Sequence, residues 1–138
     1  MKIFRLILIA FALPLFVSAQ DNKENASFDE IVKAIKNGQV SDLSTYLASS
    51  VECDILGQNE VYSKAQTVQV IKDFFAQNKA KSFSVLHQSG KNQVKYLIGS
   101  YLTITGKSFR ITCFIKQADE LYLIQQIRIE NEAKAGEG

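Results

Sequence analysis

The second half of the chain carries four successive β-patterned segments with very short connections. They span residues 82–88, 94–105, 107–117 and 120–130. Each alternates apolar and polar side chains with the period of two that strands show. Connections this short join antiparallel neighbours, because a parallel pair needs a crossover of a dozen or more residues. The pattern therefore predicts an antiparallel meander, and Gly99 inside its second strand predicts a bulge or bend that curves the sheet.

The first half of the chain predicts helices before the meander. Ser27 and Glu30 have capping-box spacing and open an amphipathic helix that ends at Asn37 and Gly38. Apolar residues recur at three to four positions through 40–47, which predicts a short second helix and hence an αα corner.

A half-buried strand and the principal helix follow. The period changes to two in residues 50–56, and Val61 and Tyr62 could form a brief returning strand. Ser63 and Gln66 repeat the capping-box spacing and open a helix that runs to about Asn78. The sequence therefore predicts an α+β fold: a curved antiparallel sheet of four long strands plus a short N-terminal strand or hairpin, packed on one long helix and an αα corner.

The start of the chain is typical of a cleavable secretory signal. Lys2 and Arg5 precede an apolar run of residues 6–17, and small residues follow to Ala19. The alternative is a membrane anchor, but the run is far shorter than the roughly 20 residues needed to span a bilayer. We expect a signal peptide at 1–19, a disordered leader at 20–26, one domain at 27–130 and a disordered tail at 131–138.

Removal of the signal changes the charge of the chain. Without Lys2 and Arg5 the 16 basic residues become 14, which equals the 14 acidic residues. A neutral chain has no overall field to attract nucleic acid or anionic lipid. We therefore expect an exported protein, periplasmic or secreted, with no nucleic-acid partner and no stable membrane anchor after cleavage.

The two cysteines, Cys53 and Cys113, raise the question of a disulfide in an oxidising compartment. Each lies in an apolar alternating run, where a free cysteine packs as a small hydrophobe. The residues alone leave both readings open.

Several stretches of the chain resemble a known fold family. They are Asn37–Gly38 through Leu43 to Val51, Val61 to Lys64, Asp73 to Phe75, Ser82 and Phe83 through His87 and Gln88, and Tyr122 to Glu130. In these and in its element order the chain resembles the cone-shaped nuclear transport factor 2-like and ketosteroid isomerase-like superfamily. Within it, the chain is similar to an exported family of unknown function from Gram-negative bacteria. A fold of this kind hosts many functions, so the resemblance implies no activity.

The resemblance bears on the cysteines, because in that fold the last strand lies between the first strand and the one that carries Cys113. Two strand spacings are about 9.6 Å, beyond the roughly 7 Å limit between the Cα atoms of a disulfide. We therefore expect no bridge between Cys53 and Cys113.

The fold that the resemblance implies encloses a conical pocket. Its candidate lining residues are His87, Tyr62, Tyr96 and Phe75. His87 shares parity with Phe83, which predicts an inward-facing side chain that could act as acid, base or ligand donor. The competing interpretation is a core or rim histidine with one hydrogen bond. Asp54 has outward parity and is expected to be a solvated carboxylate.

The outer face of the sheet is predicted to mix large apolar with polar side chains. Its apolar members are Leu97, Tyr101, Phe114, Tyr122 and Ile124, and its polar members are Arg110, Thr112, Lys116, Gln126 and Arg128. Of these, Tyr101, Phe114, Tyr122, Arg110 and Arg128 are the candidate interface of a homodimer. The competing interpretation is ordinary scattered exposure.

Motifs for catalysis or cofactor binding are missing from the sequence. It has no CxxC pair, phosphate-binding glycine loop or serine elbow, and its single histidine restricts transition-metal sites, so we expect neither cofactor nor metal. The function we predict is a non-enzymatic binding module for a small apolar ligand or a protein partner. The alternative is an isomerase or dehydratase-like enzyme that uses His87 or a pocket carboxylate.

Overall fold

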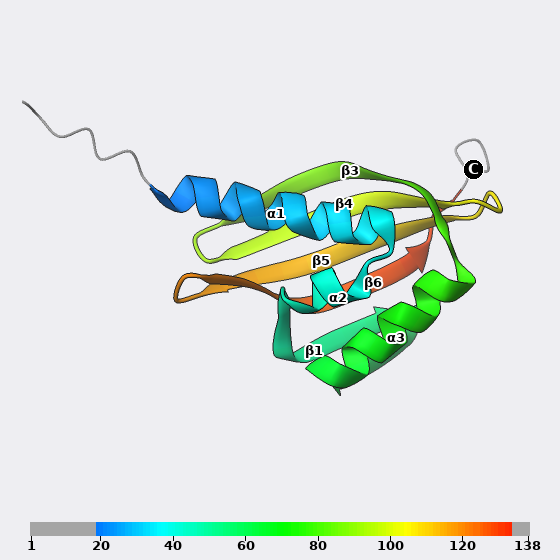
Figure 1. The fold of residues 1–138 in the computed structure, drawn as a ribbon, viewed down its shortest axis with the longest axis horizontal. Helices are drawn as coiled ribbons and strands as arrows, with labels where there is room; N and C mark the ends of the chain where they lie inside the picture. Colours follow the sequence, from blue (N-terminus) through cyan, green and yellow to red (C-terminus); the bar gives the residue numbers. More distant parts are fainter. Residues whose placement is uncertain (1–18, 134–138) are drawn as a thin grey trace, which may run out of the picture.

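The computed structural model describes residues 19–133, with side chains from Ala26 onward. Its elements are α1 (Ala19–Asn37), α2 (Val40–Ser44), β1 (Leu47–Ile55), β2 (Gln58–Ser63), α3 (Lys64–Gln77), β3 (Ala80–Lys91), β4 (Val94–Thr103), β5 (Ser108–Ala118) and β6 (Leu121–Asn131) (Figure 1). No helix within this described part is long and apolar enough to cross a bilayer. The predicted signal peptide lies outside the described residues except for Ala19, and its cleavage stays a prediction.

The six strands form one sheet in the order β2-β1-β6-β5-β4-β3. The meander β3 to β6 is antiparallel throughout, as predicted, and β1 lies parallel to β6 and antiparallel to β2. Ile127 of β6 pairs with both Cys53 and Cys113, so one whole strand separates the cysteines. Both thiols are free and buried in this structure.

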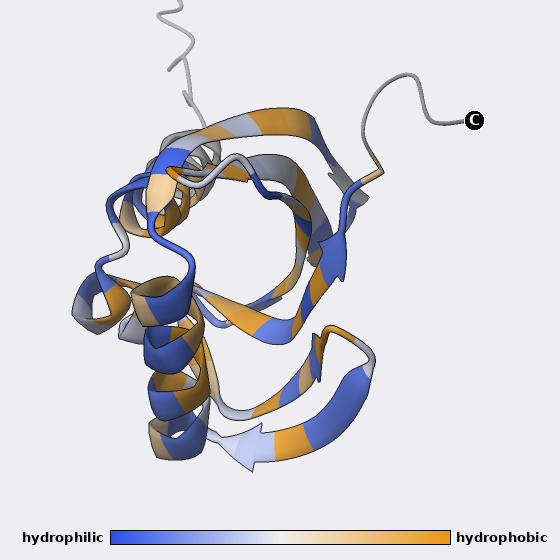
Figure 2. Cartoon of the chain, turned by 90° about the vertical axis from the view of Figure 1, so that its right-hand side faces the viewer, coloured by the Kyte–Doolittle hydropathy of each residue, from blue (hydrophilic) through white to orange (hydrophobic). Residues whose placement is uncertain are grey.

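The helices cover one face of the curved sheet. α1 packs against β3, α3 packs against β1 and β2, and α2 contacts both of these helices (Figure 1). Figure 2 shows the sheet curling through one side of the molecule while the helices close the other. The predicted α+β cone is therefore confirmed, with a concave face under the helices and a convex face away from them.

Local sequence signals explain where α3 begins. The Ser63 hydroxyl accepts a hydrogen bond from the backbone N–H of Gln66, and the Gln66 side chain accepts one from the N–H of Ser63. The predicted capping box is therefore present. The hydroxyl of Thr67, which is fully buried, donates to the carbonyl of Ser63 at 2.8 Å and so satisfies a polar group inside the core.

A bulge in β3 determines which side of the sheet His87 faces. Val85 pairs with Gly99 and His87 pairs with Ile98, so Leu86 is an extra residue in this strand. Because an extra residue interrupts the alternation, the side chains beyond it turn to the opposite face. His87 therefore lies on the convex face, and the prediction that it faces into the cone is wrong.

A second bulge, at Gln125, affects the last strand in the same way. Ile115 pairs with Ile124, whereas Phe114 pairs with Gln126. Tyr122 and Ile124 are consequently buried on the concave face, although they had been expected on the outer face with Gln126 and Arg128.

The outward assignment of Leu97 and Tyr101 is also wrong. Leu97 pairs with Cys113 and Tyr101 pairs with Phe109, and all four side chains are buried on the concave face. Alternation showed that Leu97 and Tyr101 share a face but did not show which face it is.

Both ends of the domain extend beyond their predicted limits. Helix α1 begins at Ala19 instead of Ser27, so the segment 20–26 is helical and not a disordered leader. This segment contains no glycine or proline, and it continues a helix that packs through Phe28 and Ile31. At the other end β6 reaches Asn131, and Glu132 accepts a hydrogen bond from the Ser100 hydroxyl at 2.6 Å, so the first residues of the predicted tail are ordered.

The close approach of Phe83 to Gly99 generates a prediction about the curved sheet. A Cβ atom at Gly99 would overlap the ring of Phe83 and lie 3.1 Å from the carbonyl oxygen of Ser84. Gly99→Ala is expected to lower the free energy of unfolding by about 1–3 kcal/mol, because the buried ring must move. Chemical denaturation would measure the loss. The additional change Phe83→Leu should recover part of it, and an undiminished stability of Gly99→Ala alone would contradict the argument.

Candidate functional site

Aromatic side chains fill the inside of the cone. Phe74 meets Phe109 edge to face with ring centroids 5.1 Å apart, and Phe75 stacks on Tyr101 at 5.8 Å. A void between the helices and the sheet, bordered by Phe75, Ile71 and Ile111 among others, has a volume of only about 10 Å³. That is about the space of one water molecule, so this void has no room for a ligand.

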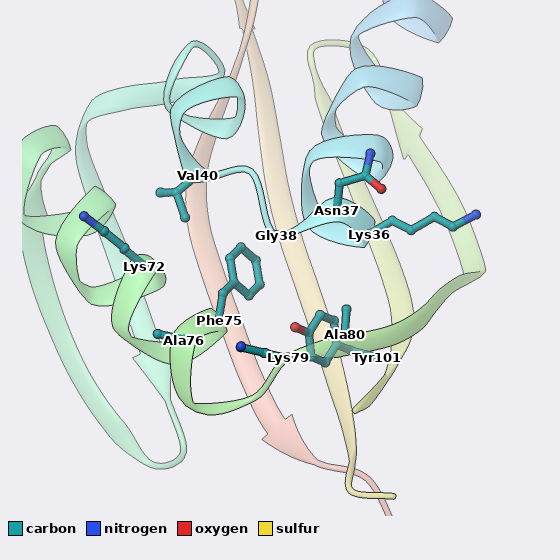
Figure 3. A pocket seen from close by; sticks show the side chains of 10 residues that line it. All are labelled: Lys36, Asn37, Gly38, Val40, Lys72, Phe75, Ala76, Lys79, Ala80 and Tyr101. Carbon is teal, nitrogen blue, oxygen red and sulfur yellow. The ribbon is translucent and has the colours of Figure 1, made fainter. Parts of the chain in front are cut away.

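A much larger recess lies on the surface, where the C-terminal ends of α1 and α3 meet the start of β3. This helix-end recess has a volume of about 440 Å³ (Figure 3). Its lining residues are Lys36, Asn37, Gly38, Val40, Lys72, Phe75, Ala76, Lys79, Ala80 and Tyr101. The volume falls within the range of roughly 300–1,000 Å³ that is typical of small-molecule sites.

The end of α1 forms one wall of the recess. Gly38 has φ +63°, a left-handed conformation that costs glycine little, and the N–H of Gln39 donates to the carbonyl of Ala34 at 2.9 Å. The helix therefore stops sharply at Asn37 and the chain turns toward Val40. This turn leaves Lys36 and Asn37 exposed at the rim.

One face of α3 and the segment after it form the opposite wall. Lys72, Phe75 and Ala76 follow the spacing i, i+3 and i+4, which places them on one side of α3, and Lys79 lies two residues after the helix ends at Gln77. Phe75 is buried, whereas the other three are exposed. The wall therefore has an apolar base and a basic rim.

Tyr101 lies beneath this base and fixes the end of α3. Its hydroxyl donates to the carbonyl of Asn78 at 2.5 Å, and its side chain is fully buried. The Asn78 side-chain amide in turn donates to the carbonyl of Phe74 at 3.1 Å. Burial raises the pKa of Tyr101 to about 12, so the phenol is protonated at neutral pH and serves as a structural donor.

The predicted pocket residues are dispersed in the structure. Phe75 lines the helix-end recess. Tyr62 lies on β2 opposite Val51 and is partly buried against the core. His87 and Tyr96 lie on the convex face, with ring centroids 5.9 Å apart.

The sequence analysis missed the three lysines of the recess. Lys72 shares a helix face with Phe75, and that spacing is visible in the sequence, whereas Lys79 lies beyond the end of α3. Lys36 is brought to the same place only by the turn at Gly38 and the packing of α1. The i, i+3, i+4 spacing of Lys72, Phe75 and Ala76 could have indicated this edge of α3, but not the wall that faces it.

The predicted interface residues divide between the two faces of the sheet. Tyr101 and Tyr122 are buried in the core, whereas Arg110, Phe114 and Arg128 lie exposed on the convex face. The Nε atom of Arg128 lies 3.4 Å from an oxygen of Asp54, which has the outward orientation that its parity predicts.

Groups suited to acid–base, nucleophilic or metal chemistry are not gathered at the recess. Its lining contains no carboxylate and no histidine. Residues 19–133 include no cluster of three or more histidine, cysteine, aspartate or glutamate side chains that could hold a metal ion. Burial raises the pKa of the Cys113 thiol to about 12, which keeps it protonated and poorly nucleophilic.

Comparison with known proteins places the chain among proteins of unknown function. A model of a domain of unknown function, DUF4783, matches residues 28–130. A DUF4783 protein from Bacteroides ovatus is 31% identical, with a TM-score of 0.73 over 76% of this chain and 94% of that one. Another, from Bacteroides fragilis, is 34% identical, with a TM-score of 0.70 over 75% of this chain and 96% of that one.

A more distant structure shows the fold class. An NTF2-like protein of unknown function from Shewanella baltica is 7% identical, with a TM-score of 0.64 over 83% of this chain and 95% of that one. At this identity the likeness concerns the fold alone. No curated protein matches the chain.

The buried phenol of Tyr101 predicts a pH dependence of stability. The folded state raises its pKa from 10.0 to about 12, so the stability that its protonated form contributes is complete below pH 10 and is lost as the pH rises through 12. Tyr101→Phe should cost about 1 kcal/mol at neutral pH, because the Asn78 carbonyl loses its donor. Chemical denaturation at several pH values should show that the free energy of unfolding falls less steeply between pH 10 and 12 in the variant than in the wild type. Both proteins retain Cys53 and Cys113, so the thiols contribute equally to the pH dependence of each. An equal slope of unfolding free energy against pH in both proteins would therefore contradict the role assigned to Tyr101.

Proposed function

The chain belongs to the DUF4783 family, and from this premise we propose that it is a non-enzymatic binding module whose helix-end recess takes a small ligand with an apolar body. The observation that carries the proposal is the contrast between the small interior void and the helix-end recess. The interior void of about 10 Å³ is too small for a ligand, whereas the recess of about 440 Å³ is open to solvent. The ligand therefore lies between the helix ends and not inside the cone.

The surface of the recess supports an apolar ligand. Val40, Phe75, Ala76 and Ala80 contribute its apolar base, and Tyr101 lies below with its hydroxyl already donating to Asn78. A polar ligand group would find no free partner at this base. The base offers apolar contact, and each Å² of apolar surface removed from water contributes about 25 cal/mol to the free energy of binding.

The arrangement of titratable groups supports binding over catalysis. The enzymatic alternative requires His87 or a carboxylate in the pocket, yet His87 lies on the convex face and the recess is lined by neither group type. General acid–base catalysis needs a group within hydrogen-bond reach of the substrate. Near the recess only lysines and a neutral phenol are available.

The convex face supports a second candidate function, association with another copy of the chain. The rings of His87, Tyr96 and Phe114 follow one another across three strands, with centroid separations of 5.9 and 5.7 Å. Phe114 is 39% exposed. A two-fold contact would bury this row against its own copy, and aromatic rings with arginine rims are typical of interfaces. Arg110 and Arg128 lie on the same convex face, Arg128 opposite Thr112 and Arg110 further along β5, opposite Glu130.

The proposed binding site predicts the effect of blocking the recess. Ala76→Trp places a large side chain in the recess from an exposed position, and it is expected to weaken the binding of decan-1-ol about tenfold or more. Isothermal titration calorimetry would measure the affinity. Gln77→Trp is the matched control, because Gln77 is exposed on the same helix but does not line the recess. Equal binding by both variants would overturn the proposed site.

The proposed association predicts a concentration-dependent dimer in native mass spectrometry. Phe114→Asp should abolish it, because a carboxylate would be buried in the contact without a partner. Ile104→Asp should leave the dimer intact, since Ile104 is exposed in the turn between β4 and β5 and not within the ring row. A wild-type protein that stays monomeric at every concentration would eliminate this second candidate.

A further inference from the structure

The helix-end recess has a basic rim that its apolar base does not explain. Building on the proposed function, we infer that the ligand is an amphipathic anion: a small molecule with an apolar body and a carboxylate or similar oxyanion. The three lysines at the rim carry this inference. Lys36 comes from the last turn of α1, whereas Lys72 and Lys79 come from the facing side of α3 and the residues after it (Figure 3).

No carboxylate lies three or four positions along the chain from any of the three lysines. The residues three and four positions to either side of Lys36 are Val32, Lys33, Gln39 and Val40. Those around Lys72 are Val68, Gln69, Phe75 and Ala76, and those before Lys79 are Phe75 and Ala76. The helix-surface ion pairs that usually neutralise such lysines are therefore not available to them.

The acidic residue nearest in sequence to this wall is hydrogen-bonded to a polar neighbour on α3. Asp73 accepts a hydrogen bond from the side chain of Gln69 at 3.1 Å. None of the three rim lysines forms an ion pair with a described residue. The recess therefore gathers three positive charges with no negative side chain among its lining residues.

The helix ends oppose this charge but do not cancel it. The C-terminal ends of α1 and α3 both border the recess, and each contributes the equivalent of roughly half a negative charge. Three lysines against two such ends leave about two positive charges. Hydrogen bonds from the N–H of Gln39 to Ala34 and from that of Asn78 to Phe74 further satisfy the terminal carbonyls.

The arrangement of base and rim selects the ligand class. The apolar body of the ligand would lie on Phe75, Ala76 and Ala80. The side chains of Lys36 and Lys72 extend away from Phe75 (Figure 3), and their flexible stems would let the ammonium groups fold back toward the anionic group. Each ammonium group is carried on a flexible stem and acts as a point charge without a preset geometry. The site therefore discriminates by charge, and it accepts more than one oxyanion.

A set of probes with the same apolar chain tests this inference. Decanoate, decan-1-ol and decylammonium would be titrated into the whole protein by calorimetry at low salt. We expect decanoate to bind roughly tenfold more tightly than decan-1-ol, and decylammonium to bind most weakly. Raising the salt concentration to 0.5 M should weaken the binding of decanoate and leave that of decan-1-ol unchanged, because added ions screen exposed charges.

Charge-matched variants then show which lysines cause the preference for decanoate over decan-1-ol. Lys36→Gln, Lys72→Gln and Lys79→Gln combined should remove the preference for decanoate and leave decan-1-ol binding intact. Lys64→Gln, Lys91→Gln and Lys107→Gln combined remove the same charge at exposed positions outside the recess and should leave the preference unchanged.

The outcomes separate this inference from the proposed function. If decan-1-ol binds and Ala76→Trp blocks it, but decanoate binds no better, the anionic class is wrong and the proposed binding site stands. If none of the three probes binds, both are overturned. If both triple variants reduce the preference for decanoate equally, the overall charge of the protein causes this preference and the lysines at the rim do not.

Discussion

Phe74, Phe75, Tyr101 and Phe109 pack against one another between α3 and the sheet, and the rest of the molecule depends on this contact. Their rings lie 5.1 to 6.0 Å apart and occupy the volume that a hollow cone would leave open. Tyr101 also holds the end of α3 through the Asn78 carbonyl. The packing that fills the interior therefore also positions the end of α3 that borders the recess. One set of ring contacts accounts for both the filled core and the surface site.

Two single-residue bulges determine how the sheet presents its faces. Leu86 turns His87 to the convex side, and Gln125 separates the inward Ile124 from the outward Gln126. The extra residues cost ladder hydrogen bonds locally, and they add the curvature that wraps the sheet around the aromatic core. Gly99 lies opposite the first bulge, where the ring of Phe83 takes the space of a side chain. The bulges at Leu86 and Gln125 therefore determine both the curvature of the sheet and the face on which the neighbouring side chains lie.

The sequence predicted the features that depend on local residue spacing. It did not predict which face of the sheet a residue occupies, because strand pairing and bulges determine that. The capping box at Ser63, the antiparallel meander and the α+β class follow from spacing and turn residues, and the resemblance added the position of β6 between the cysteine strands. The face of His87 could not be predicted, because one inserted residue reverses parity and leaves no compositional signal. Only Phe75 of the predicted pocket lines the recess, since the two walls of this site come from different helices, at Lys36 and at Lys72, which are 36 positions apart in sequence.

We propose that a ligand occupies the helix-end recess while the cone interior stays filled. A methyl NMR titration of the protein with decanoate tests this most directly. The predicted result is a set of shifts at Val40, Ala76 and Ala80, with the interior methyl groups of Ile111, Ile127 and Ile129 unchanged. Progressive shifts at those isoleucines, with Ala76 and Ala80 unaffected, would show that the ligand enters the cone and would contradict the account.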